Sequence, residues 1–233
     1  LSRKHGGLRI LPPFGYADKR RDGDYRGRMD ALAGVYSYLE RIRQDYVVLA
    51  GGDVAVNLDL DDVFEHHLRT GADITAVCTP VPRGDARESD YFTVDENGLI
   101  VDVSVHPVSP MGCESMEVYI MSKDLLISLV EHCIAHNIPS FSQGVLLNMI
   151  DRLKLVSYTF EGYAARLQSV AGYYARSMEL LDPAIRADLF NDHRPIKTKD
   201  MSNPSTYYGP GSISRNSLVA DGCIIEGEVE NSI

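Results

Sequence analysis

The sequence predicts an α/β fold with a mixed sheet, followed by the start of a left-handed β-helix. Two observations favour this class. Short apolar runs alternate with stretches whose apolar residues recur every three or four positions, as strands and amphipathic helices do in turn. Near the carboxyl end, "VADGCI" and "IEGEVE" then repeat a six-residue pattern typical of a β-helix.

The size and charge of the chain narrow its class. Its 233 residues, 44% of them hydrophobic, suit one large domain or a domain with a smaller appendage. A formal charge of -10 disfavours nucleic acid and anionic membranes as partners. The four cysteines lack metal-binding spacing, and no apolar run is long enough to span a bilayer. We therefore expect a cytoplasmic protein with reduced thiols. Because the chain starts with Leu1 and stops within an apolar pattern, we expect an internal fragment.

The amino-terminal third reads as a βαβ unit. A strand in residues 6–13, closed by two prolines, precedes a basic loop in residues 16–28. Apolar residues then recur at helical spacing: Met29, Leu32, Ala33, Tyr36, Leu39 and Ile42. The unbroken apolar run 46–50 predicts a strand covered on both faces in a parallel sheet.

Further helices and strands follow in alternation. A helix is expected over 60–71, capped by Asp59 or Asp61 and ended by Gly71, with a buried strand after it at 73–80. Residues 91–105 predict a hairpin that turns at 96–98. The strand 116–122 leads into a helix at 123–137 that Ser122 can cap. The pattern continues to about residue 182.

The composition changes in the last quarter of the chain. Residues 1–182 form the predicted α/β domain, and residues 183–212, rich in Pro, Ser, Gly and Asn, read as a linker. Residues 213–233 are expected to form the first, truncated turn of the β-helix. Small apolar residues occupy the first and fifth positions of the two six-residue units and should point inward: Val219, Cys223, Ile225 and Val229.

The most suggestive candidate residue is Asp53. It directly follows the strand 46–50, at the carboxyl end where open α/β sheets bind ligands. Gly51 and Gly52 would let a sugar or phosphate approach the backbone, and a carboxylate there could hold Mg²⁺. The alternative is that the glycines turn the chain and Asp53 caps the turn.

Other polar clusters carry less information. Arg26 and Arg28, near the start of a helix, could form an anion site, or belong to a solvated basic loop. Upstream basic residues could join them: Lys19, Arg20 and Arg21. His66 and His67 are expected on the surface of an acidic helix. The remaining spaced pair lacks a third metal ligand: His132 and His136.

Four segments together resemble the glucose-1-phosphate adenylyltransferases, also called ADP-glucose pyrophosphorylases, of bacterial glycogen synthesis. They are residues 25–32, 46–77, 177–181 and 217–233, of which the last is the most specific. The resemblance covers the chain from residue 6 onward. It implies a nucleotidyltransferase domain in residues 1–182, with a Rossmann-like mixed sheet and helices on both faces. That domain would lack its amino-terminal part, where the family carries a Gly-rich nucleotide loop. The resemblance also implies a β-helix domain and a tetramer.

The functional segments of the family map onto particular positions here. The helix opening of the type GTADA matches 27–31, which implies substrate contacts for Gly27, Arg28 and Asp30. The segment SGDH matches 51–54, which keeps Asp53 and loses the histidine. The lysine of EKP, which binds the sugar phosphate, falls on His106.

The fourth segment, DVGT, carries the second metal carboxylate of the family and falls on Arg166. Two carboxylates ordinarily hold the Mg²⁺ that neutralises the triphosphate, and a guanidinium in place of one disfavours a metal. The resemblance therefore implies that Asp53 is a vestigial metal-site carboxylate, with Arg166 in place of its partner. No metal or other cofactor is expected, except Mg²⁺ if the protein is catalytically active.

This pattern resembles the GlgD-type subunit, a regulatory or non-catalytic partner of a catalytic GlgC-type subunit in a hetero- or homotetramer. Such a protein would be weak or inactive as an enzyme alone, and could still bind sugar phosphates. The alternative is an active subunit that makes ADP-glucose and pyrophosphate from ATP and glucose-1-phosphate with Mg²⁺. A hexapeptide-repeat acyltransferase is a third hypothesis, disfavoured by the few, terminal repeats.

Overall fold

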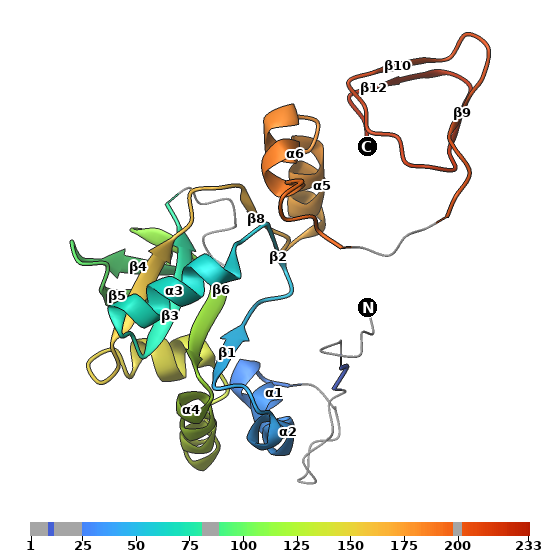
Figure 1. The fold of residues 1–233 in the computed structure, drawn as a ribbon. Helices are drawn as coiled ribbons and strands as arrows, with labels where there is room; N and C mark the ends of the chain where they lie inside the picture. Colours follow the sequence, from blue (N-terminus) through green and yellow to red (C-terminus); the bar gives the residue numbers. More distant parts are fainter. Residues whose placement is uncertain (1–8, 12–24, 81–88, 198–201) are drawn as a thin grey trace.

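The computed structural model describes residues 9–11, 25–80, 89–197 and 202–233. They form an α/β body followed by a short coil of strands at the carboxyl end (Figure 1). In the described ranges, no helix combines the length and the apolar character needed to cross a membrane.

The centre of the body is a mixed six-stranded sheet in the order β5-β4-β6-β3-β7, with β1 paired to β6. The strands are β1 (Tyr46–Leu49), β3 (Ile74–Thr79), β4 (Asp90–Val94), β5 (Ile100–Val105), β6 (Cys113–Ser122) and β7 (Leu155–Thr159). β3 and β7 are parallel, and the other pairs are antiparallel. β1 and β4 share one edge of the long strand β6: β1 pairs with its end and β4 with its beginning.

Helices cover both faces of this sheet, as predicted. On one face, α1 (Arg28–Gly34), α2 (Tyr36–Arg41) and α4 (Lys123–His136) bury Met29, Leu39 and Leu126 against the strands. On the other, α3 (Leu60–Thr70) buries Val63 against Val77. The body also contains a π-helix, Ser142–Leu147, and the helices α5 (Val170–Glu179) and α6 (Pro183–Leu189).

Local signals set several element ends where they were expected. Asp59 caps α3 by accepting a hydrogen bond from the amide of Asp61 at 3.1 Å, and Gly71 ends the helix with φ 58°. Ser122 caps α4 through the amide of Leu125. The β4–β5 hairpin turns at Gly98, with φ 81°. Side-chain capping and permissive glycines thus act as predicted.

Two predictions about the first βαβ unit need correction. The helix expected from Met29 to Ile42 is interrupted at Val35, which has φ -114° and ψ 16°. The prediction of a doubly covered parallel strand at 46–50 is wrong, because β1 pairs antiparallel with β6. Val47 packs toward the core under α4, whereas Val48 on the opposite face is 44% exposed. An unbroken apolar run is compatible with burial of both faces of a strand. It does not show that other elements cover both faces.

The carboxyl end forms two pairs of short parallel strands (Figure 1). They are β9 (Tyr207–Tyr208) with β11 (Ile224–Ile225), and β10 (Ile213–Arg215) with β12 (Glu228–Glu230). The repeat-pattern residues are half-buried: Val219, Cys223, Ile225 and Val229. α6 lies inside the stretch 183–212 that the sequence predicts as a linker.

Candidate functional site

A two-stranded ribbon beside the main sheet brings Asp53 next to Arg166. β2 (Val54–Val56) follows Asp53 directly and pairs antiparallel with β8 (Ala164–Arg166), with Val54 opposite Arg166. The amide of Leu167 also donates to the carbonyl oxygen of Asp53 at 2.7 Å. Two residues far apart in the sequence therefore become neighbours through backbone pairing.

The Arg166 guanidinium lies between two carboxylates. Its Nη2 donates to Asp53 Oδ2 at 2.9 Å and to Glu117 Oε1 at 2.7 Å, and its Nη1 donates to the carbonyl oxygen of Ser115 at 3.3 Å. Arg28 pairs with the other oxygen of Glu117, Oε2. We call Arg28, Asp53, Glu117 and Arg166 the ion-pair quartet. Its two positive and two negative side chains balance in charge.

Glu117 is not among the site residues that the sequence predicts. This residue lies within β6 in a left-handed conformation, φ 52°, close to a register shift in the pairing of β3 with β6. The glutamate in the apolar segment "MEVYIMS" was the one local signal that could have identified it. A carboxylate in an otherwise apolar strand needs a charged or hydrogen-bonding partner.

The side chains of the quartet differ in their exposure to solvent. The side chain of Arg166 is 6% exposed, that of Glu117 24% and that of Asp53 34%. Burial alone would lower the pKa of Arg166, but hydrogen bonds and charges from Glu117 and Asp53 outweigh it and raise that pKa above its ordinary value. Arg166 is therefore a permanent cation. Within the described part of the chain, its buried Nε has no hydrogen-bond partner.

This arrangement does not fit the divalent cation that a catalytically active member of the resembled family would hold. A metal bridging Asp53 and Glu117 would stand where Arg166 Nη2 now stands, and like charges exclude each other from one position. Across the described ranges, no three His, Cys, Asp or Glu side chains are grouped to hold a metal ion. The site as built is an internal ion-pair network.

Gly51 lies against the two carboxylates, so a side chain at this position would displace the Asp53 carboxylate. A Cβ atom there would lie 2.9 Å from Asp53 Oδ1 and 3.3 Å from Glu117 Oε2. Gly52 differs, because a Cβ atom at that position would meet no described atom within 4 Å. The structure thus brings together Gly51, Asp53, Arg28 and Arg166 from the predicted site residues.

Gly27 and Asp30 have contacts of a structural kind. A Cβ atom at Gly27 would lie 2.5 Å from the carbonyl oxygen of Pro139, so this position requires glycine for packing. Asp30 forms an ion pair with Arg26 at 2.7 Å, and Arg26 Nη2 also donates to Asn137. The Arg26 side chain is therefore already bound by Asp30 and Asn137. The upstream basic residues of the predicted anion site lie outside the described residues: Lys19, Arg20 and Arg21.

His106 lies just beyond the end of β5. It has φ 49°, and its Nε2 is 4.0 Å from Asp90 Oδ1, the carboxylate of a side chain that is 5% exposed. The hydroxyl of Ser142 donates to the other Asp90 oxygen. The position where the resemblance predicts the family's lysine therefore holds a half-exposed imidazole next to a buried carboxylate.

The prediction that His67 lies on the surface is wrong. Its side chain is buried on the inner face of α3, with Nδ1 2.8 Å from the hydroxyl of Thr75 and the ring edge-on to Tyr46. The neighbouring His66 is half-buried. Burial lowers the pKa of each imidazole. The acidic residues around them suggested exposure, but position 67 falls on the inner face of the helix.

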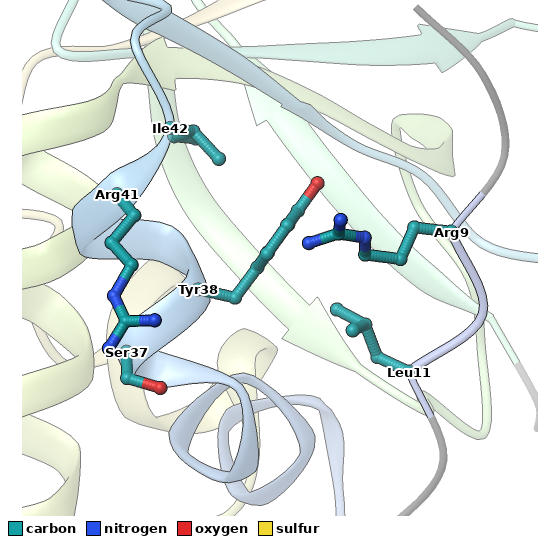
Figure 2. A pocket seen from close by; sticks show the side chains of 6 residues that line it. All are labelled: Arg9, Leu11, Ser37, Tyr38, Arg41 and Ile42. Atoms are coloured by element: carbon teal, nitrogen blue, oxygen red, sulfur yellow. The ribbon is translucent and has the colours of Figure 1, made fainter.

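One cavity lies away from these residues, between the segment 9–11 and α2. It has a volume of about 330 Å³ and is lined by Arg9, Leu11, Ser37, Tyr38, Arg41 and Ile42 (Figure 2). The Arg9 guanidinium stands over the Tyr38 ring, 5.2 Å from its centroid. The sequence predicted no functional residue among those that line this cavity.

Comparison with known proteins points to one group. No family model matches the chain. A glucose-1-phosphate adenylyltransferase of Halalkalibacterium halodurans is 31% identical over all of this chain and 61% of its own length, and one of Geobacillus stearothermophilus is 28% identical over 61% of its length. The glycogen biosynthesis protein GlgD of Bacillus subtilis is 31% identical over 57% of its length. The chain spans about three fifths of these relatives.

Proposed function

We propose, from the premise that this chain is homologous along its whole length to the glucose-1-phosphate adenylyltransferases, that it belongs to a GlgD-type subunit of such an enzyme. In this proposal the protein acts in glycogen biosynthesis by supporting a catalytic GlgC-type partner, and does not itself transfer the adenylyl group. The homologues include enzymes and a GlgD protein, so homology alone leaves both roles open. The position of Arg166 favours the supporting role.

The chemistry explains why this one observation carries the proposal. Transfer of an adenylyl group from ATP to a sugar phosphate needs a cation that neutralises the triphosphate and aligns the attacking oxygen. Arg166 stands where the family resemblance expects the second metal carboxylate, and Asp53 is engaged with it at 2.9 Å. Neither side chain is then available to a metal, so the corner lacks the means to organise ATP in the usual way.

The carboxyl end supports the proposed domain arrangement. Each of its two parallel strand pairs joins segments roughly one triangular coil apart in the sequence, as hexapeptide repeats would place them. We take residues 213–233 as the start of a left-handed β-helix domain, residues 183–212 as its connection and residues 1–182 as the nucleotidyltransferase-like domain. The family resemblance implies a tetramer, and we propose a heterotetramer with the catalytic subunit.

A mixing experiment tests the proposal. The full-length protein is expressed alone, a GlgC-type subunit alone, and both together, and ADP-glucose formation is measured with and without sugar-phosphate effectors. We expect negligible activity from the protein alone, and a higher rate or a changed effector response in the mixture. An unrelated protein at the same concentration serves as the control. A mixture that behaves like the catalytic subunit alone would overturn the proposal.

The retained Asp53 favours one alternative, a catalytically active subunit that makes ADP-glucose with Mg²⁺. This alternative requires Arg166 to leave Asp53 when ATP and Mg²⁺ bind. It predicts substantial activity of the full-length protein alone that Asp53→Asn abolishes. The supporting role predicts that Asp53→Asn leaves the activity of the mixture close to that of the wild type.

A further inference from the structure

In the ion-pair quartet, the Arg166 guanidinium lies between the carboxylates of Asp53 and Glu117, where a cation could bridge them. We infer that Arg166 Nη2 substitutes for a divalent cation, so that this corner is held without metal, and that Asp53 and Glu117 form a latent cation site that opens when the guanidinium is removed. The inference concerns the ion pairs of this chain. It holds whether or not the protein supports a catalytic partner.

The first argument is the geometry of the two carboxylates. Asp53 Oδ2 and Glu117 Oε1 approach the same nitrogen atom at 2.9 Å and 2.7 Å, although they come from different elements. Oxygen ligands lie about 2.0–2.6 Å from Mg²⁺ or Ca²⁺. A divalent cation at the position of this nitrogen would therefore need each carboxylate to move by only a fraction of an ångström.

The second argument is that hydrogen bonds other than those of Arg166 hold the main chain at Asp53 and Glu117. The amide of Gly51 donates to the carbonyl oxygen of Glu117 at 3.1 Å, and the amide of Glu117 donates to the Ser115 hydroxyl at 3.1 Å. The carbonyl oxygen of Asp53 accepts from the amide of Leu167 at 2.7 Å. Shortening the Arg166 side chain removes none of these bonds, so the main chain should keep the two carboxylates within reach of one cation.

The third argument is charge. With the guanidinium removed, Asp53 and Glu117 face only Arg28, which pairs with Glu117 Oε2 and leaves Oε1 free. The corner then carries one net negative charge, and a partly buried charge without a partner is costly. Both side chains are partly exposed, 34% for Asp53 and 24% for Glu117. A hydrated cation can therefore reach the two carboxylates from solvent.

The donor set decides which cation fits. Two carboxylate oxygens face the space, and the carbonyl oxygen of Ser115, which now accepts from Arg166 Nη1, would be released to it. Oxygen ligands favour Mg²⁺, Mn²⁺ and Ca²⁺ over softer metals. Mn²⁺ is a suitable probe, because its binding is measured directly by electron paramagnetic resonance.

The test compares full-length wild type with Arg166→Gln for Mn²⁺ binding and for the change in melting temperature in millimolar Mn²⁺. We expect Arg166→Gln to bind one Mn²⁺ more per chain than the wild type and to melt at a higher temperature when Mn²⁺ is present. Either Asp53→Asn or Glu117→Gln, added to Arg166→Gln, should remove that extra ion. Arg166→Lys, which keeps the charge, should exclude it.

A matched control separates this effect from a general loss of positive charge. Arg176→Gln removes an arginine paired with Glu179 at 2.8 Å on α5, and it should bind no extra Mn²⁺. The outcomes for Arg166→Gln decide the inference. If this variant folds only when Mn²⁺ is added, the inference is supported. A variant that folds but binds no extra ion, or that no cation rescues, contradicts it, as does wild-type Mn²⁺ binding that Asp53→Asn abolishes. No readout here is an activity, so failure of this test and failure of the mixing experiment are distinguishable.

Discussion

Strands β3 and β8 are both buried, but they are stabilised in different ways. Every residue of β3 is buried, and its apolar side chains alternate between the two core clusters on the two faces of the sheet. β8 is buried over Ala164–Arg166, yet it ends in a guanidinium that bonds to side chains from two other elements. The stabilisation from burying hydrocarbon is non-directional, so any apolar neighbour can provide it. Burial of a charge requires particular partners at particular distances.

The largest expected effect lies in the apolar strand. Ile74→Ala removes a side chain that is 0% exposed in the main core cluster, and we expect unfolding to cost about 2–5 kcal/mol less because a cavity remains. Urea denaturation at equilibrium measures this. Val101→Ala, at a position on β5 that is 50% exposed, is the control and should change stability by less than about 0.5 kcal/mol. Equal effects at the two sites would contradict the assignment of β3 to the core.

Removal of the buried charge should have a smaller effect. Breaking a fully buried ion pair costs about 3–5 kcal/mol. We expect about 2 kcal/mol for Arg166→Met, because Asp53 and Glu117 are partly solvated and Arg28 still pairs with Glu117. Arg176→Met, which breaks a more exposed pair, should cost less than about 1 kcal/mol in the same denaturation assay.

A double-mutant cycle sharpens that result. Glu117→Gln added to Arg166→Met should cost less than the sum of the two single effects, because each single variant leaves the other charge without one partner. Additive effects would show that Arg166 and Glu117 do not interact energetically, and the contrast between β8 and β3 would then reduce to apolar packing.

The same contrast explains how much the sequence could predict. The apolar run of β3, the caps of α3 and the β4–β5 hairpin depend on neighbours along the chain, and periodicity and turn residues predicted them. Family resemblance predicted that Asp53 and Arg166 share one site, a proximity that the β2–β8 pairing shows. Glu117 was missed because its role depends on two arginines distant in sequence, and local patterns carry no information about such partners.

His67 offers a third case, a polar group buried between these extremes. Burial lowers its pKa, the nearby Asp73 carboxylate opposes this effect and His66 adds to it. A folded pKa below the unfolded value of about 6.5 means that the unfolded state binds the proton more readily. The stability from neutral His67 is therefore present above about pH 6.5 and is lost as the pH falls, at no more than about 1.4 kcal/mol per pH unit.

We expect His67→Gln to flatten the fall in stability between about pH 7 and pH 5, measured by urea denaturation at each pH. The glutamine amide can still bond to the Thr75 hydroxyl, so stability at neutral pH should change little in comparison. His193→Gln, at an exposed position, is the matched control for the loss of one histidine. An unchanged slope in His67→Gln would mean that other groups account for the acid sensitivity.

The smallest expected effect concerns the backbone of Glu117. It tests whether the left-handed conformation of this residue costs stability in the ion-pair quartet. Glu117 has φ 52°, a conformation that costs a residue with a side chain about 1 kcal/mol relative to glycine. Glu117→Gly and Glu117→Ala both lose the contacts to Arg28 and Arg166, but only the glycine variant relieves the backbone. We therefore expect the alanine variant to be less stable than the glycine variant by about 1 kcal/mol in urea denaturation. At the exposed strand position Asp102 the order should reverse, because glycine weakens an ordinary strand. Equal stability of the two variants at position 117 would show that the left-handed backbone carries no strain, and that the carboxylate sits between the two arginines at no conformational cost.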